Sequence, residues 1–117
     1  MNEIMNFEGN DVEVIQNENG EPLFKIYSTG KALGYVAKAK GNVYPYKERI
    51  LKIAENAEIT LVSHGVKQYL TESQLYDFML EARTDKCRIF RKWVTNEVLP
   101  SIRKTGNYTV PKAPSLP

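Results

Sequence analysis

Several cations recur at helical spacing in the last third of the sequence. Over residues 84–98 a helix is expected, because polar and apolar positions alternate there with the helical period. Its polar side consists of Arg88, Arg91, Lys92, Thr95 and Asn96. Each cation can neutralise one phosphate of a nucleic acid, and hydroxyl and amide groups can hydrogen-bond to phosphates or base edges. This face therefore suits a phosphate backbone, although the spacing alone is more typical of an ordinary solvated helix face.

The basic residues are concentrated in two blocks. Residues 22–52 carry seven bases and one acid, and residues 83–104 carry seven bases and two acids, whereas residues 1–21 carry six acids and no Lys or Arg. If the two blocks converge on one face of the fold, they form an electrostatic footprint for nucleic acid. The further candidate phosphate contacts in these blocks are Arg103, Lys104, Lys38, Lys40, Lys47 and Arg49.

Residues 37–46 mix cations with aromatic side chains. Gly41 and Pro45 interrupt this segment, so a helix or loop is expected. Tyr44 and Tyr46 can stack on exposed bases, and Asn42 can reach a base edge. The alternative is that one or both tyrosines are core residues with a solvated hydroxyl group.

The sequence offers little for catalysis. His64 is the only histidine and is expected in a hairpin turn, and Cys87 is the only cysteine, which excludes zinc sites built from several cysteines. There is no nucleophile-elbow motif and no glycine-rich phosphate loop. We therefore expect no enzymatic activity, no metal and no cofactor. No apolar run approaches 18 residues, so no membrane association is expected either.

The basic helix must be positioned by the elements that precede it. Thr71 and Gln74 have the spacing of a capping box, flanked by Leu70 and Leu75 at staple positions, so a helix is expected after Thr71. Strands are expected at residues 6–7, 11–16, 22–26, 59–62 and 66–70, and a short helix capped by Ser28 or Thr29 and ended by Gly34. The predicted fold class is α+β, with two short antiparallel β-hairpins packed against a helical core.

The second helix also has an apolar side, made of Cys87, Phe90, Trp93, Val94 and Val98. Glu97 falls within this arc, so we expect it to be partly buried and to form an ion pair. Its candidate partners are Arg83, Lys86 and Arg103. Pro100 is expected to end this helix and to open a short new turn that closes at Thr105-Gly106.

The stretch from residue 90 to 108 resembles the end of the Bro-N domain. It reads FRKWVTNEVLPSIRKTGNY, and it follows TESQLYDFMLEA. The resemblance extends back to about Leu23, because Phe24 and Ala32-Leu33-Gly34-Tyr35 match an aromatic strand end and a helix end of that domain. Near the start of this helix the family usually has an Asp, whereas this chain has Ser28-Thr29.

Bro-N domains form the N-terminal part of phage antirepressors and of the baculovirus repeated-ORF proteins. The resemblance implies a domain over residues 1–108 of a phage or prophage regulator that binds double-stranded DNA in the switch from lysogenic to lytic growth. It places the protein in the cytoplasm of the bacterial host. The alternative is a protein-interaction module that binds a phage repressor or mediates self-association into a homo-oligomer. Residues 109–117 are expected to be a Pro-rich linker towards a C-terminal domain that is absent from this sequence.

Overall fold

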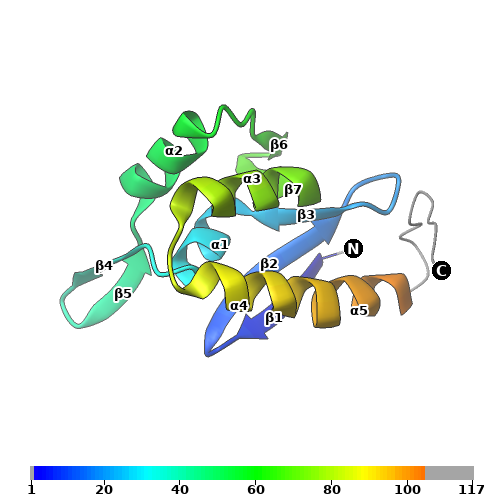
Figure 1. Cartoon of the computed structure of the whole chain (residues 1–117), viewed down its shortest axis with the longest axis horizontal. Helices are drawn as coiled ribbons and strands as arrows, with labels where there is room; N and C mark the ends of the chain where they lie inside the picture. Colours follow the sequence, from blue (N-terminus) through cyan, green and yellow to red (C-terminus); the bar gives the residue numbers. More distant parts are fainter. Residues whose placement is uncertain (1, 105–117) are drawn as a thin grey trace.

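The computed structural model describes residues 2–104, and the side chains of residues 3–102. Its centre is a five-stranded antiparallel sheet in the order β1-β2-β3-β7-β6 (Figure 1). These strands are β1 Asn2–Phe7, β2 Asn10–Gln16, β3 Pro22–Lys25, β7 Lys67–Thr71 and β6 Val62–His64. The two predicted hairpins are joined into one sheet because β3 pairs with β7. A separate two-stranded sheet consists of β4 Val36–Ala39 and β5 Asn42–Pro45.

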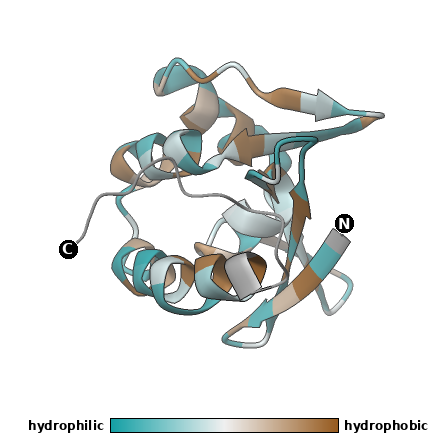
Figure 2. Ribbon diagram, turned by 90° about the vertical axis from the view of Figure 1, so that its right-hand side faces the viewer, coloured by the Kyte–Doolittle hydropathy of each residue, from teal (hydrophilic) through white to brown (hydrophobic). Residues whose placement is uncertain are grey.

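Helices cover one face of the five-stranded sheet (Figure 2). They are α1 Ile26–Ala32, α2 Lys47–Asn56, α3 Glu72–Ala82, α4 Lys86–Trp93, the π-helical turn η1 Val94–Val98 and α5 Leu99–Lys104. Helix α2 packs against α1 and α3. Among the described residues, no helix is long and apolar enough to cross a membrane.

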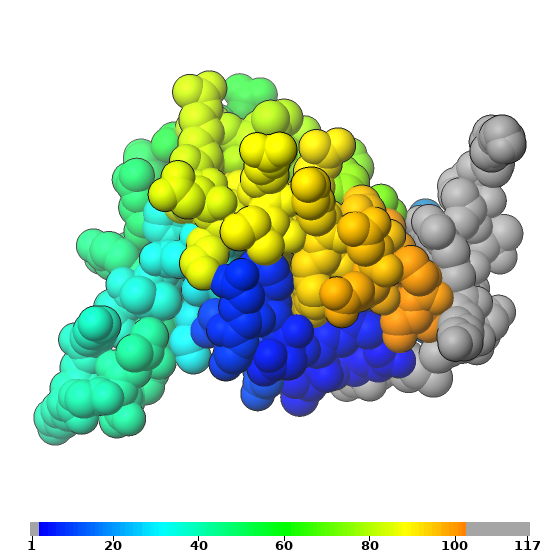
Figure 3. Space-filling model, turned by 60° about the horizontal axis from the view of Figure 1, so that its bottom comes forward, coloured from blue at the N-terminus to red at the C-terminus, as the bar shows by residue number. Residues whose placement is uncertain are grey.

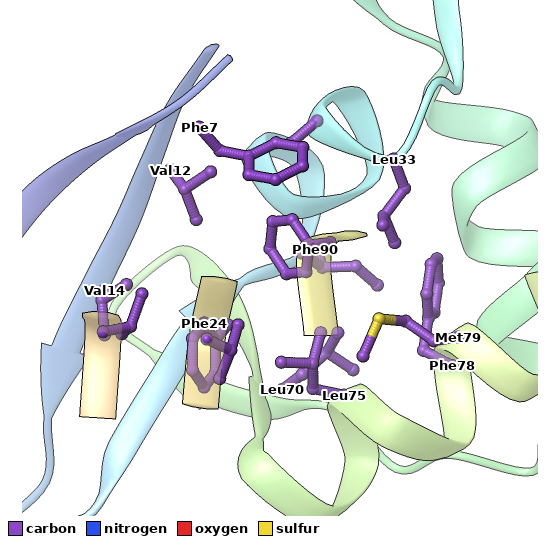
Figure 4. Packing of buried hydrophobic residues seen from close by; sticks show 14 of the residues in the cluster. Phe7, Val12, Val14, Phe24, Leu33, Leu70, Leu75, Phe78, Met79 and Phe90 are labelled. Atoms are coloured by element: carbon purple, nitrogen blue, oxygen red, sulfur yellow. The ribbon is translucent and has the colours of Figure 1, made fainter. Parts of the chain in front are cut away.

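Alternation along the central strands separates two clusters of buried side chains. Val14, Phe24 and Leu70 are cross-strand neighbours on the helix-covered face, where they belong to the main core together with Phe90 of α4 (Figure 4). The residues next to them in sequence, Ile15, Leu23 and Tyr69, form a smaller cluster of their own. The α+β class and the helical core predicted from the sequence are thus confirmed.

The start of α3 is as predicted. Thr71 Oγ1 accepts a hydrogen bond of 3.1 Å from the Gln74 backbone N–H, and Gln74 Oε1 accepts one of 3.0 Å from the Thr71 N–H. Leu70 and Leu75 are both buried beside this capping box. The reciprocal bonds satisfy two backbone donors that the first turn of a helix otherwise leaves unpaired.

The predicted end of the second helix is wrong, because the helical run continues from Lys86 to Lys104. Leu99 N–H donates to the carbonyl oxygen of Val94, which is five residues earlier, so the chain widens into a π-helical turn just before Pro100. A proline ring collides with the preceding turn of a regular α-helix, and the wider turn accommodates it. The turn predicted at Thr105-Gly106 lies outside the described residues.

Glu97 is exposed, so its predicted partial burial is wrong. The extra residue in the π-helical turn changes the rotation of the following side chains about the helix axis, and Leu99 is buried beside Val98, which lies on the apolar side as predicted. Among the residues whose side chains are described, Glu97 forms no ion pair.

The region from residue 26 to 56 differs most from the prediction. Helix α1 begins at Ile26 instead of being capped by Ser28 or Thr29. Ser28 Oγ accepts a hydrogen bond of 3.1 Å from the Glu13 N–H and so ties α1 to β2. Residues 36–45 form a β-hairpin and not a helix or loop. Helix α2 was not predicted; it buries Ile50, Ile53 and Ala54.

Candidate nucleic-acid interface

Helix α4 is held in place by its apolar side and presents its cations to solvent. The Phe90 ring meets the ring of Phe7 on β1 edge-on, with their centroids 5.0 Å apart, and the Trp93 ring lies 5.3 Å from that of Phe7. The predicted polar side is exposed throughout: Arg88, Arg91, Lys92, Thr95 and Asn96. The anchored aromatic side therefore sets the direction in which the cations point.

These cations are not neutralised by neighbouring acids. Within residues 3–102, neither Arg88, Arg91 nor Lys92 forms an ion pair. Lys86, one turn earlier, does pair with Glu8 on the turn between β1 and β2. The result is a local excess of positive charge beyond the first turn of α4, which suits an anionic ligand.

The remaining predicted contacts of the second basic block lie in α5. Arg103 and Lys104 continue the helical run that begins at Lys86. Their side chains lie outside the described part of the chain, so only their position at the far end of this run is established.

The first basic block divides between a hairpin and a helix. Lys38 lies on β4 and Lys40 in the hairpin turn, both exposed, whereas Lys47 and Arg49 lie on α2. Lys47 Nζ is 5.0 Å from the centroid of the Tyr27 ring, and Arg49 Cζ is 6.0 Å from that of Tyr35. These two cations are partly engaged with aromatic faces of the protein itself, which leaves Lys38 and Lys40 as the freer pair.

Tyr44 and Tyr46 are 49% and 45% exposed. The alternative that one or both are core residues is therefore wrong. Tyr44 lies on the hairpin, and Tyr46 immediately precedes α2.

Two hydrogen bonds join the residues between α1 and the hairpin to the end of α3 and to the connection between α3 and α4. The Tyr35 hydroxyl group donates to the carbonyl oxygen of Ala82 over 2.9 Å, and Thr84 Oγ1 donates to the carbonyl oxygen of Leu33 over 2.8 Å. Burial raises the pKa of Tyr35, and the nearby positive charge of Arg49 only partly opposes this effect. Figure 3 shows the hairpin, in cyan to green, and α4, in yellow, on the same face of the molecule.

An apolar groove lies between α3 and α4 on the flank of the basic face. It has a volume of 540 Å³ and is lined by Met79, Leu80, Cys87, Arg88 and Arg91 among others. Leu80 lines this groove and is 71% exposed, so it adds apolar surface that a partner could cover. Two of the candidate DNA contacts therefore also border a surface that suits a protein.

The acidic N-terminal hairpin has a structural role at Glu13. Its carboxylate accepts from Lys25 Nζ at 3.4 Å, from Lys67 Nζ at 3.3 Å and from the Tyr69 hydroxyl group at 3.4 Å. Burial alone raises the pKa of Glu13, but the two lysines outweigh it and hold this pKa below its ordinary value. This cluster ties β2 to β3 and β7.

A family model described as "BRO family, N-terminal domain" matches residues 11–100 of this chain. The chain belongs to the BRO family. The match covers β2 to the start of α5 and so includes both the hairpin and the α4 cations, whereas Arg103 and Lys104 lie beyond it. Bro-N is a family of the DNA-binding type rather than a catalytic one.

An uncharacterized protein of Haemophilus influenzae is similar to this Bro-N domain. It is 30% identical over 113 residues, which are 96% of this chain and 55% of that protein. The chain therefore spans about half the length of this relative. No solved structure matches the chain.

The sequence reasoning missed Tyr35 and Thr84, which join the two parts of the candidate interface in this Bro-N domain. Tyr35 and Ala82 are 47 positions apart, and Thr84 and Leu33 are 51 positions apart. The only feature of the sequence near Tyr35 that marked it was its place directly after Gly34, and this place does not indicate which residue the hydroxyl group binds.

Proposed function

We propose that this Bro-N domain binds double-stranded DNA through its phosphate backbone, with the exposed side of α4 as the principal contact. The observation that carries the proposal is the set of three exposed cations, Arg88, Arg91 and Lys92, which form no ion pair within residues 3–102 and sit on a helix anchored by Phe90. A fixed, unneutralised positive surface binds phosphates without losing existing partners.

Further phosphate contacts are assigned by position. Lys38 and Lys40 reach the same duplex from the hairpin, and Arg103 and Lys104 extend the contact along the helical run. Lys47 and Arg49 assist from α2, where aromatic rings already hold them. Each contact adds affinity without reading sequence, because phosphates are the same at every base pair.

We also propose a biological setting, which membership of the BRO family supports. A Bro-N domain of this kind acts in a phage or prophage antirepressor that promotes the switch from lysogenic to lytic growth, in the cytoplasm of the bacterial host. Binding to DNA places such a regulator at the promoters that it controls.

Salt dependence tests this proposal. Fluorescence polarisation with a labelled duplex of random sequence would measure the association constant of residues 1–117 over a series of salt concentrations. We expect its logarithm to fall linearly with the logarithm of the salt concentration, with a slope of about −0.9 for each phosphate contacted. Absence of binding at the lowest salt concentration contradicts the proposal.

The groove between α3 and α4 favours a second candidate function, a protein-interaction module that binds a phage repressor or a second copy of this chain. Its support is the exposure of Leu80 beside an apolar hollow. Binding at such a surface depends weakly on salt, because an apolar interface releases few counterions. Replacing Leu80 by Ser would then abolish binding of the protein partner while leaving DNA binding unchanged.

A further inference from the structure

The β4–β5 hairpin projects from the body of the molecule as a ribbon of its own (Figure 1). It belongs to neither edge of the five-stranded sheet, and all its residues from Ala37 to Tyr44 are exposed. A two-stranded ribbon that buries so little is only marginally stable by itself. Its fixed foot at Tyr35 compensates for this and aims the ribbon outward.

Pairing across the ribbon determines which side chains share a face. Ala37 lies opposite Tyr44, and Ala39 lies opposite Asn42, so one face carries these four residues. The other face carries Lys38 opposite Val43. On the first face, the two alanines have short side chains, and the carboxamide of Asn42 lies next to the turn.

The dimensions and charge of the ribbon suit a groove of DNA. The turn is tight, because Lys40 and Gly41 both adopt positive φ angles of 51° and 81°. Residues 22–47 contain no Asp or Glu, so no acid on the ribbon repels a phosphate. The major groove of B-DNA is about 12 Å wide and admits a two-stranded β-ribbon.

We propose that the β4–β5 hairpin enters the major groove and that Asn42 reads a base edge there, with Lys38 and Lys40 at the flanking phosphates. This inference rests on the proposed function and adds sequence recognition to it. A carboxamide presents a donor and an acceptor side by side, which matches the N6 and N7 edge of adenine.

The hydrogen bonds of Ala82 and Thr84 hold the ribbon and α4 in a fixed relation, so both can contact one duplex. Because hydrogen bonds fix the foot of the ribbon to the residues that precede α4, the distance between the reading tip and the phosphate-binding face is set by the fold. Contacts by α4 then select the register in which Asn42 meets the bases.

The experiment starts by enriching a library of random duplexes for those that bind the full chain. Wild type, Asn42→Ala and the control Asn56→Ala, which changes an exposed residue at the end of α2, are then titrated against the enriched duplex and a random duplex. We expect Asn42→Ala to weaken binding to the enriched duplex by about ten- to a hundredfold. Binding to the random duplex and the behaviour of Asn56→Ala should match wild type.

Two competitors assign the groove. Methyl green, which occupies the major groove, should displace the protein from the enriched duplex, whereas netropsin, which occupies the minor groove, should not. If the library yields no preferred sequence, or if Asn42→Ala binds the enriched duplex like wild type, the assignment of Asn42 is overturned while DNA binding stands. If wild type binds no duplex at all, the proposed function and this inference both fail.

Discussion

The hydroxyl group of Tyr35 lies 2.9 Å from the carbonyl oxygen of Ala82 and donates a hydrogen bond to it. This bond joins the foot of the β4–β5 hairpin to the last residue of α3. The Tyr35 N–H donates to the carbonyl oxygen of Gly30, and the Tyr35 carbonyl oxygen accepts from the Tyr46 N–H over 2.9 Å, so one residue connects α1, the hairpin and α3. The relation between the hairpin and the basic helix depends on it.

Replacing Tyr35 by Phe removes the donor and leaves the ring. We expect the free energy of unfolding to fall by about 1 kcal/mol, and amide hydrogen exchange across residues 36–45 to accelerate because the foot of the hairpin is less constrained. Urea unfolding measures the loss of stability, and hydrogen exchange followed by mass spectrometry measures the exchange rate of residues 36–45. Tyr44→Phe, which changes an exposed tyrosine on the hairpin, should alter neither the stability nor the exchange rate. Equal exchange rates in wild type and Tyr35→Phe contradict the role of the bond between Tyr35 and Ala82.

Replacing Gly30 by Ala should separate α1 from α2. A Cβ atom at this position would lie 2.5 Å from Cδ1 of Ile50, which is fully buried. Overpacking of this kind costs about 1–3 kcal/mol, and thermal unfolding measures it. Gly30→Ala should cost less in an Ile50→Ala background than in wild type, because Ile50→Ala removes all three atoms that the new Cβ would meet; a Gly30→Ala variant as stable as wild type contradicts the close packing.

Replacing Thr71 by Ala should remove the cap of α3. The expected loss is about 1 kcal/mol of stability, since the Gln74 N–H loses its acceptor. Urea unfolding measures the difference. Ser73→Ala changes an exposed residue of the same turn and should leave stability equal to or slightly above that of wild type; equal losses in the two variants contradict a specific capping role.

Glu13 should make stability depend on acid pH. Its folded pKa is held below the ordinary value of 4.5, so its stabilising effect is fully present above that value and is lost as the pH falls through the folded pKa. Glu13→Gln should therefore be less stable than wild type near neutral pH, and the difference should shrink at acid pH. Urea unfolding across a pH series measures it; a difference that stays constant into acid contradicts the lowered pKa.

Local spacing predicted the parts of the fold that depend on neighbouring residues. Thr71 and Gln74 lie three positions apart, and their capping box formed as expected. The exposure of Arg88, Arg91 and Lys92 was also predicted, because regular helical rotation holds up to Trp93. Beyond that residue the π-helical turn breaks the regular rotation, and the prediction for Glu97 failed with it.

Features that depend on distant contacts could not be predicted from one sequence. The β4–β5 hairpin was expected as a helix or loop, because Gly41 and Pro45 interrupt the segment; in the structure Gly41 lies in the hairpin turn and Pro45 is the last residue of β5. Helix α2 begins two residues after Pro45 and was not predicted either. The bond between Tyr35 and Ala82 joins residues 47 positions apart, and no spacing in the sequence indicates it.

The most direct test of DNA binding by α4 is the salt dependence of a variant that lacks its three cations. The association constants of wild type and of Arg88/Arg91/Lys92→Ala for a random duplex would be measured by fluorescence polarisation over the same salt series. We predict that the slope of the logarithmic plot decreases in magnitude by about 3, roughly one for each cation removed, while Arg88→Lys/Arg91→Lys/Lys92→Arg keeps the wild-type slope. An unchanged slope in the alanine variant would contradict the assignment of α4 as the DNA-binding face.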